Sequence, residues 1–168
     1  MEVVIREATE GDYEALCVII EEVDSMHREA LPRRFKAPEG PARQRNYIVN
    51  AVRAPDVGLF VAEMGSQLVG FVHVLVKDVP VIPIFVPRRY ALIDNLAVKR
   101  AHRRGGVGRA LMKRAEAWAR AKGATSVELN VYAFNRPAQG FYRKLGYETL
   151  RHYLRRSLGT SEPERRDG

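Results

Sequence analysis

The fold predicted for this chain depends mainly on residues 92–119, LIDNLAVKRAHRRGGVGRALMKRAEAWA. This stretch contains most of an apolar run over residues 90–98, which predicts a buried strand. It ends in a helix predicted over 107–122, where apolar residues recur at helical spacing. A further β-branched run at 126–131 predicts the next strand. Strand, helix and strand in this order predict a right-handed crossover between parallel strands.

The start of the predicted helix is rich in glycine and arginine. The residues at this turn are Arg103, Arg104, Gly105, Gly106, Val107, Gly108 and Arg109. A helix N-terminus exposes unpaired N–H groups and the positive end of the helix dipole. Glycine also serves as an ordinary turn residue between a strand and a helix. Three glycines together with three arginines instead favour a site for a di-anionic pyrophosphate.

Two other phosphate-binding loops are excluded by the residues at this turn. The chain has no GxxxxGK[ST] sequence, so it is not a P-loop nucleotidase. The dinucleotide fingerprint requires a third glycine where Leu111 stands, and it requires the glycines directly after a strand, whereas residues 99–104 intervene here. The pyrophosphate therefore belongs to a different kind of ligand.

Periodicity and turn residues predict the remaining elements of the chain. Thr9 and Asp12 form a capping-box-like pair, Gly65-Ser66 indicates a hairpin, and three prolines predict an extended insertion over residues 78–89. The predicted segments are a strand at 3–8, a helix to residue 23, an irregular region at 24–40, a helix at 41–52, strands at 59–64 and 68–76, a short helix from Asn135 to Gly146, and a last strand at 147–157. The order β-α-α-β-β-β-α-β-α-β predicts an α/β fold with a twisted, mixed sheet and four flanking helices.

Composition is typical of one globular domain. The chain has 168 residues, 46% of them hydrophobic, and a formal net charge of +8. We expect a single domain over 1–158 and a disordered polar tail at 159–168. The N-terminus has no signal-peptide pattern, and no apolar run is long enough to span a membrane. The single cysteine, Cys17, fits a cytoplasmic protein, and no Cys/His spacing indicates a metal.

Residues 92–119 resemble motif A of the GNAT superfamily of N-acetyltransferases, whose signature is R/Q-x-x-G-x-G/A. Arg103, Gly106 and Gly108 match this signature in place. The stretch LNVYAFNRPAQGFYRKLGYE, residues 129–148, resembles the family's motif B. The resemblance implies a mostly antiparallel mixed sheet of six to seven strands. It departs from the usual pattern at His102, where many relatives have an aromatic residue, and at Arg104 and Gly105, where the glycine and the basic residue are exchanged.

The resemblance implies acetyl-CoA as co-substrate, with no metal. The backbone of Leu96, Ala97 and Val98 would contact the pantetheine arm, and a backbone N–H near Ala97 or Val98 would stabilise the oxyanion. Residues 103–109 would hold the pyrophosphate, chiefly by backbone N–H groups. Asn135 would contact the coenzyme, and Tyr142 would donate a proton to the leaving thiolate.

The acceptor is expected to be a primary amine on a small molecule, a peptide N-terminus or a lysine. An amine must be neutral to attack, so a base is expected. Asp94 is the first candidate, because alternation places it on the same strand face as Leu96 and Val98; Glu128 and His73 are weaker candidates. By resemblance, Met26 and His27 would line the acceptor site.

Several alternatives remain open from the sequence. The +8 charge allows a basic module that binds nucleic acid or another acidic partner without catalysis, although no aromatic-interleaved basic platform supports nucleic-acid binding. Succinyl or propionyl could replace acetyl. A homodimer is common in the family, and nothing in the sequence forbids it.

Overall fold

The computed structural model describes residues 2–158, and the predicted tail at 159–168 lies outside the described residues. Two compact units meet in the sequence between Phe134 and Asn135. The first unit contains the whole sheet and three of the four α-helices, and the second contains α4, Arg136–Lys144. No helix among the described residues is long and apolar enough to cross a membrane.

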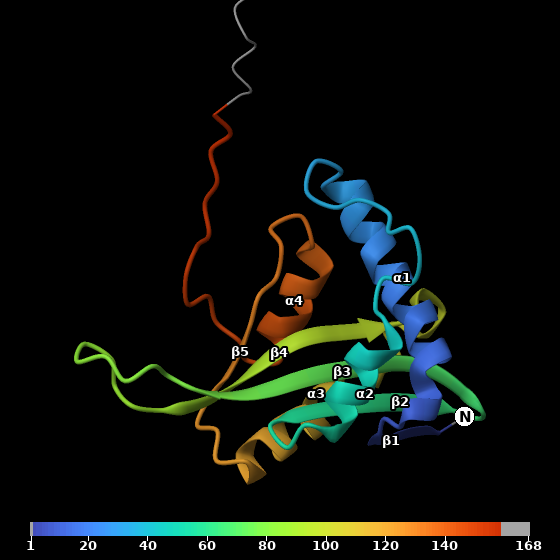
Figure 1. The fold of residues 1–168 in the computed structure, drawn as a ribbon, viewed down its shortest axis with the longest axis horizontal. Helices are drawn as coiled ribbons and strands as arrows, with labels where there is room; N and C mark the ends of the chain where they lie inside the picture. Colours follow the sequence, from blue (N-terminus) through green and yellow to red (C-terminus); the bar gives the residue numbers. More distant parts are fainter. Residues whose placement is uncertain (1, 159–168) are drawn as a thin grey trace, which may run out of the picture. The chain divides into compact units, whose positions relative to one another are not determined.

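A mixed sheet forms the centre of the first unit (Figure 1). Its strands, in both spatial and chain order, are β1 (Val3–Glu7), β2 (Val57–Met64), β3 (Gln67–Asp78), β4 (Arg89–Val98) and β5 (Val127–Leu129). Neighbours are antiparallel except β4 and β5, which are parallel and joined by a crossover through α3. The predicted mixed, mostly antiparallel sheet and the crossover are therefore confirmed.

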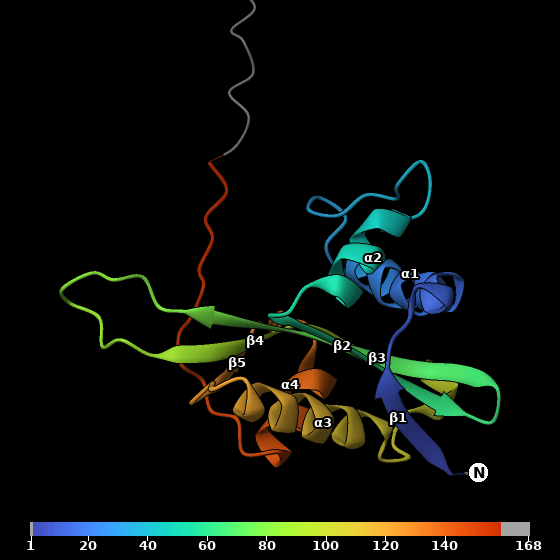
Figure 2. The same ribbon diagram turned by 60° about the horizontal axis from the view of Figure 1, so that its bottom comes forward.

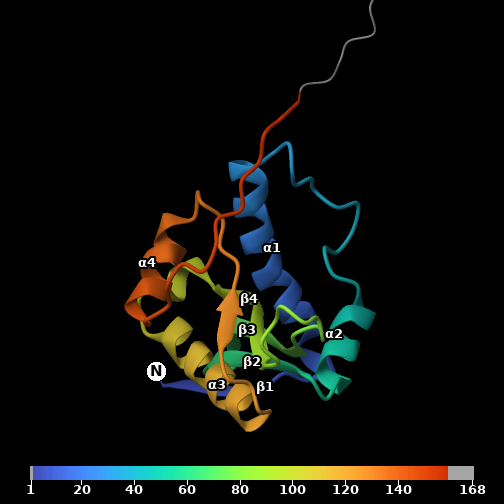
Figure 3. The ribbon, with the colours of Figure 1, turned by 90° about the vertical axis from the view of Figure 1, so that its left-hand side faces the viewer.

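Helices cover both faces of this sheet (Figures 2 and 3). The helices α1 (Tyr13–Ala30) and α2 (Arg45–Arg53) lie on one face, and α3 (Val107–Ala121) lies on the other. Their amphipathic patterns put one apolar stripe of each helix against the sheet. Buried side chains on the α1/α2 face include Leu16, Ile19, Ile48, Val61 and Phe71.

The α3 helix packs closely on strands β3 and β4. A Cβ atom added at Gly70 would lie 2.7 Å from the Ala97 carbonyl oxygen and 3.2 Å from Leu111 Cδ1. It would also lie 3.3 Å from Val98 Cγ2, so the Val98 side chain points to the α3 face. The absence of a side chain at Gly70 thus lets β3, the end of β4 and α3 come together.

The described sheet has five strands rather than six or seven, because the predicted strand at 147–157 is absent. Residues 148–158 have no regular structure. Their apolar side chains Leu150, Tyr153 and Leu154 are 76%, 86% and 89% exposed. Alternation of residue types suggested a strand here, but a strand also needs a neighbour with which to share hydrogen bonds.

The insertion between β3 and β4 interrupts the two strands as predicted, but it contains turns at residues 80–85 and is not extended throughout. The two strands pair as far as Asp78 and Arg89, and the segment between them forms a loop that projects from the sheet (Figure 1). Five of its large apolar side chains are exposed, namely Val81, Ile82, Ile84, Phe85 and Val86.

The region predicted to be irregular at 24–40 begins later than expected. Helix α1 continues to Ala30, so Met26 and His27 are helical rather than part of a loop.

Candidate functional site

The strands β4 and β5 separate beyond Ile93, at the β5 edge of the sheet. Their parallel pairing covers only Ala91–Ile93 on β4 and Val127–Leu129 on β5. Beyond Ile93, β4 continues to Val98 with no strand paired on its β5 side among residues 2–158. The predicted pantetheine-binding residues Leu96, Ala97 and Val98 lie on this unpaired length, so backbone groups of β4 are left available to a ligand.

A β-bulge at Asp94 corrects the expected placement of that residue. The register passes from Val74↔Ile93 to His73↔Asn95, which inserts Asp94 as an extra residue in β4. The bulge interrupts the alternation of side chains. The Asp94 carboxylate therefore lies with His73 beneath α2, whereas Val98 faces α3, and the expectation that Asp94 and Val98 share a face is wrong.

The loop that joins β4 to α3 is anchored at its start. Glu22 Oε1, on α1, accepts a hydrogen bond from the Arg100 backbone N–H at 2.8 Å and one from Arg103 Nη2 at 3.0 Å. Arg103 Nε also donates to the Val98 carbonyl at 2.9 Å. The motif arginine, Arg103, therefore directs its side chain toward β4 and α1. These contacts fix the conformation at the start of the loop.

The remaining loop residues form an exposed turn before α3. Arg104 has φ +66° and Gly106 has φ +85°, so both adopt the left-handed conformation. Helix α3 starts at Val107, whose side chain is buried in the core, leaving only its backbone N–H for a ligand. Gly108 and Arg109 follow in the first turn, where N–H groups have no partner within the helix.

Positive charge remains available at this turn. Arg104 and Arg109 are exposed, and neither forms an ion pair with another described residue. Gly105 and Gly106 are exposed as well, and a Cβ at Gly106 would meet nothing within 4 Å. Free N–H groups, the helix dipole and two unpaired guanidinium groups together suit a pyrophosphate.

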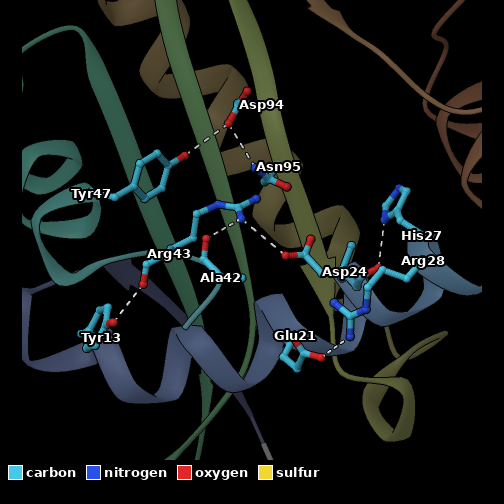
Figure 4. Close-up of polar contacts among 11 residues, drawn as sticks. Tyr13, Glu21, Asp24, His27, Arg28, Ala42, Arg43, Tyr47, Asp94 and Asn95 are labelled. Atoms are coloured by element: carbon cyan, nitrogen blue, oxygen red, sulfur yellow. Dashed lines mark hydrogen bonds and ion pairs between the residues drawn. The ribbon is translucent and has the colours of Figure 1, made fainter. Parts of the chain in front are cut away.

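A second polar cluster surrounds Asp94 on the α1/α2 face (Figure 4). Asp94 Oδ2 lies 3.2 Å from His73 Nδ1, 3.1 Å from Asn95 Nδ2 and 3.4 Å from the Tyr47 hydroxyl. His73 is buried, whereas the Asp94 side chain is 41% exposed. The hydrogen bond from His73, with those from Asn95 and Tyr47, lowers the pKa of Asp94, so this carboxylate is ionised at neutral pH.

Arg43 and Asp24 border this cluster. Arg43 Nη1 lies 3.4 Å from Asp24 Oδ2, and Arg43 Cζ lies 5.9 Å from the centre of the Tyr47 ring. Burial and the nearby Asp94 charge raise the pKa of Tyr47, which therefore stays protonated and can donate to Asp94.

His27 lies in an aromatic cluster at the end of α1. Its ring centre is 5.5 Å from that of Phe35, 5.4 Å from that of Tyr132 and 5.6 Å from that of Phe134. His27 Nδ1 donates to the Val23 carbonyl at 2.9 Å. These contacts fix the His27 ring, whereas Met26 makes no polar side-chain contact with another residue of 2–158.

Asn135 and Tyr142 belong to the second unit. Asn135 Oδ1 accepts a hydrogen bond from the Ala138 N–H at 3.2 Å and caps α4, as the sequence predicted. The Tyr142 ring lies 5.2 Å from that of Phe141 and 5.8 Å from that of Tyr147. Burial raises the pKa of Tyr142 to about 12, so its hydroxyl is protonated at neutral pH.

The weaker candidates have structural partners. Glu128 forms an ion pair with Arg88 at 2.8 Å. His73 contacts Asp94 and Tyr47 and is described above. Among the described residues, no group of three or more His, Cys, Asp or Glu side chains is arranged to hold a metal ion.

Sequence reasoning missed two residues that shape these clusters. Tyr47 was not singled out, although it is an aromatic residue beside the buried positions Ile48 and Ala51 of α2. Glu22 was missed because its partners, Arg100 and Arg103, are about 80 residues away in the chain.

Comparison with known proteins agrees with this architecture. The profile of the acetyltransferase (GNAT) family matches residues 20–147. An N-alpha-acetyltransferase of Sulfurisphaera tokodaii is 26% identical over 142 residues, which cover 80% of this chain and 79% of that protein. A mutant of the BH1408 protein from Bacillus halodurans has a similar structure, with a TM-score of 0.88, 26% identity and coverage of 92% of this chain and 99% of that chain.

The fold is also that of AAC(6')-Iy, solved with a bisubstrate analogue that contains CoA. That structure has a TM-score of 0.73 at 15% identity and covers 95% of this chain and 100% of its own. The fold, the glycine-rich loop before α3 and the match to the family profile together define this protein as an acyltransferase. This chain belongs to the acetyltransferase (GNAT) family.

Proposed function

We propose that this protein transfers an acetyl group from acetyl-CoA to a primary amine, by direct attack in a ternary complex. The observation that carries the proposal is the end of β4–β5 pairing at Ile93, followed along the chain by the glycine-rich turn at the start of α3. Beyond Ile93, β4 has no paired strand on its β5 side among the described residues, and its free backbone groups suit an extended amide-containing arm. The turn suits the pyrophosphate to which such an arm is attached.

The residues divide between the two ends of the coenzyme. Backbone N–H groups of residues 104–109, with the side chains of Arg104 and Arg109, bind the pyrophosphate. Leu96, Ala97 and Val98 offer backbone groups to the pantetheine arm, and an N–H near Ala97 or Val98 binds the developing oxyanion. Asn135 contacts the coenzyme from the second motif. A single oxyanion donor of this kind contributes about 3 kcal/mol to the transition state.

Tyr142 acts on the departing sulfur. A thiol has a pKa of about 8.5, well below the value of about 12 for the buried Tyr142 hydroxyl. Complete proton transfer to the thiolate is therefore uphill, and the tyrosine stabilises the thiolate chiefly by donating a hydrogen bond. The nitrogen–carbon bond forms as the carbon–sulfur bond breaks, and the amine proton passes to solvent.

An acceptor panel tests this function. Purified protein is incubated with acetyl-CoA and with polyamines, amino acids, peptides with free N-termini and lysine-containing peptides, and free thiol is measured. Succinyl-CoA and propionyl-CoA are included to define the acyl chain. We expect acetyl-CoA to support thiol release with one class of amine, and release with no amine in the panel would overturn the proposal.

A binding measurement separates this function from the alternative of a non-catalytic basic module. Acetyl-CoA at 100 times its Kd should stabilise the folded protein by about 2.7 kcal/mol and raise its Tm. Duplex DNA should leave the Tm unchanged. A shift with DNA and none with acetyl-CoA would favour the basic module, in which the +8 charge serves an acidic partner.

A further inference from the structure

We propose that Tyr47, His73 and Asn95 are positioning residues that hold Asp94 Oδ2, so that Asp94 Oδ1 binds the acceptor as an alkylammonium ion. The inference rests on the proposed function for its place in the reaction, and it names the acceptor class as a cationic primary amine. Each of the three positioning side chains comes from a different part of the first unit: α2, β3 and the position next to Asp94 on β4.

The hydrogen bonds to Asp94 are divided unequally between its two oxygens. All three described partners contact Oδ2, at 3.1 to 3.4 Å. Oδ1 has no hydrogen-bond partner among the described residues, and the side chain is 41% exposed. A carboxylate held by one oxygen keeps the lone pairs of the other directed to a ligand.

The hydrogen bond to Asp94 places a proton on His73 Nδ1. An ionised carboxylate can only accept a hydrogen bond, so the Nδ1 atom of His73, 3.2 Å from Asp94 Oδ2, carries a proton. His73 Nε2 is buried and has no hydrogen-bond partner among the described residues.

The charges around Asp94 favour an ammonium ion. From α2 and β3 it faces the Tyr47 hydroxyl and the His73 ring, and from β4 it faces the amide of Asn95. Arg43, a cation on this face, pairs with Asp24 and lies against the Tyr47 ring. No hydrogen bond joins Arg43 to Asp94 in the described structure, so the negative charge of Asp94 is free for an acceptor (Figure 4).

The same environment makes Asp94 a weak base. Its lowered pKa is far below that of an alkylamine, which is about 10. Asp94 therefore binds and orients the ammonium, and the proton is lost to solvent water before the neutral nitrogen attacks. The rate constant kcat/KM should rise with pH up to the pKa of the amine, with no acidic limb from Asp94 above about pH 4.

A matched pair of His73 variants tests the positioning role. His73→Asn keeps an N–H donor near the place of Nδ1, whereas His73→Gln moves its donor to the place of Nε2. With an alkylamine acceptor, His73→Gln should raise the amine KM about tenfold, the effect of losing one hydrogen bond to a charged group. His73→Asn should stay within about threefold of wild type, and the acetyl-CoA KM should change in neither variant.

Tyr47→Phe provides a second test, because it removes the hydroxyl and keeps the ring of this exposed side chain. It should raise the amine KM by about three- to tenfold, because Asp94 Oδ2 loses one donor. Equal losses in His73→Asn and His73→Gln, together with no change in Tyr47→Phe, would show that the cluster only fills space, and the inference would be overturned.

The charge of the acceptor is tested at Asp94 itself. Asp94→Asn should raise the KM of an alkylamine about 10- to 100-fold, and should affect an arylamine, which is uncharged at neutral pH, by less than about threefold. Equal effects on both amines would contradict binding as an ammonium ion.

A carboxyl-carbon NMR titration separates this inference from the proposed function. The Asp94 resonance should titrate at higher pH in His73→Gln than in wild type or His73→Asn, and it should shift when butylammonium is added. If no amine is acetylated but these shifts occur, the proposed function fails and the ammonium site stands. If acetylation occurs and butylammonium leaves the Asp94 resonance unchanged, the ammonium site fails alone.

Discussion

Arg104 carries backbone strain at the start of α3. It is the one non-glycine residue with positive φ among residues 2–158, at +66°. An L-residue in this conformation costs about 1–2 kcal/mol. The turn requires the left-handed conformation at this position, which glycine adopts without this cost.

Arg104→Gly should therefore stabilise the free protein and weaken coenzyme binding. Relief of strain, less the greater entropy of glycine in the unfolded chain, should raise the free energy of unfolding by up to about 1 kcal/mol. Loss of the guanidinium should lower acetyl-CoA affinity. Urea unfolding and calorimetric titration measure the two effects, and Arg109→Gln, which removes charge without changing φ, should show only the second.

Tyr142→Phe separates chemistry from binding. The variant loses the hydroxyl and keeps the ring packing against Phe141 and Tyr147. A hydrogen bond to a charged group is worth about 1.5–3 kcal/mol, so kcat should fall about 10- to 100-fold. Acetyl-CoA affinity should stay within about threefold. Steady-state kinetics decide the matter, and an unchanged kcat would remove Tyr142 from the reaction.

The helix α1 fixes the loop between β4 and α3, through Glu22. Its carboxylate joins the first residues of the loop to a helix on the α1/α2 face of the sheet. Glu22→Gln weakens the charge-assisted bonds to Arg100 and Arg103. We expect acetyl-CoA affinity to fall about fivefold, since the pair is partly exposed and worth about 1 kcal/mol.

Glu21→Gln is the matched control for this change. Glu21 neighbours Glu22 and pairs with Arg28 on the surface of α1, away from the loop. Fluorescence titration with CoA should find this variant indistinguishable from wild type. An equal loss in both variants would mean that helix charge, and not the tether to the loop, controls affinity.

Sequence signals were sufficient to predict those elements that depend on local residues. The hairpin at Gly65-Ser66, the cap at Asn135 and the helix after residue 106 were all predictable, because each depends on residues within a few positions of one another. The bulge at Asp94 and the contact of Tyr47 with Asp94 were not, because they depend on which residues face one another across strands and helices. The prediction of a strand at 147–157 was wrong for the same reason, because the residue pattern does not show which strand would pair with it.

For the molecule as a whole, the partly buried ion pair of Arg6 with Asp12 links folding to pH. Arg6 forms two hydrogen bonds of 2.8 Å with the two oxygens of Asp12, and the Thr9 N–H adds a third at 2.7 Å. These bonds lower the pKa of Asp12 from 3.8 to about 2. Because the folded-state pKa is the lower one, this stabilisation is present above pH 3.8 and is lost as the pH falls toward 2.

Asp12→Asn should therefore destabilise the protein in a pH-dependent way. At pH 7 the free energy of unfolding should fall by about 2 kcal/mol relative to wild type. The difference should shrink as pH drops through the range between about 4 and 2. Urea unfolding at several pH values measures it, and a difference independent of pH would assign the effect to packing instead.

The short pairing of β4 with β5 also determines where the native state opens first. Only three register pairs join these strands, whereas β2 and β3 share eight. Amide protons along β5 and residues 94–98 should exchange with deuterated solvent through local fluctuations, well before the central hairpin exchanges. A ligand lying against that edge would slow exchange there selectively, so the protection pattern would trace the path of the coenzyme without any assay of turnover.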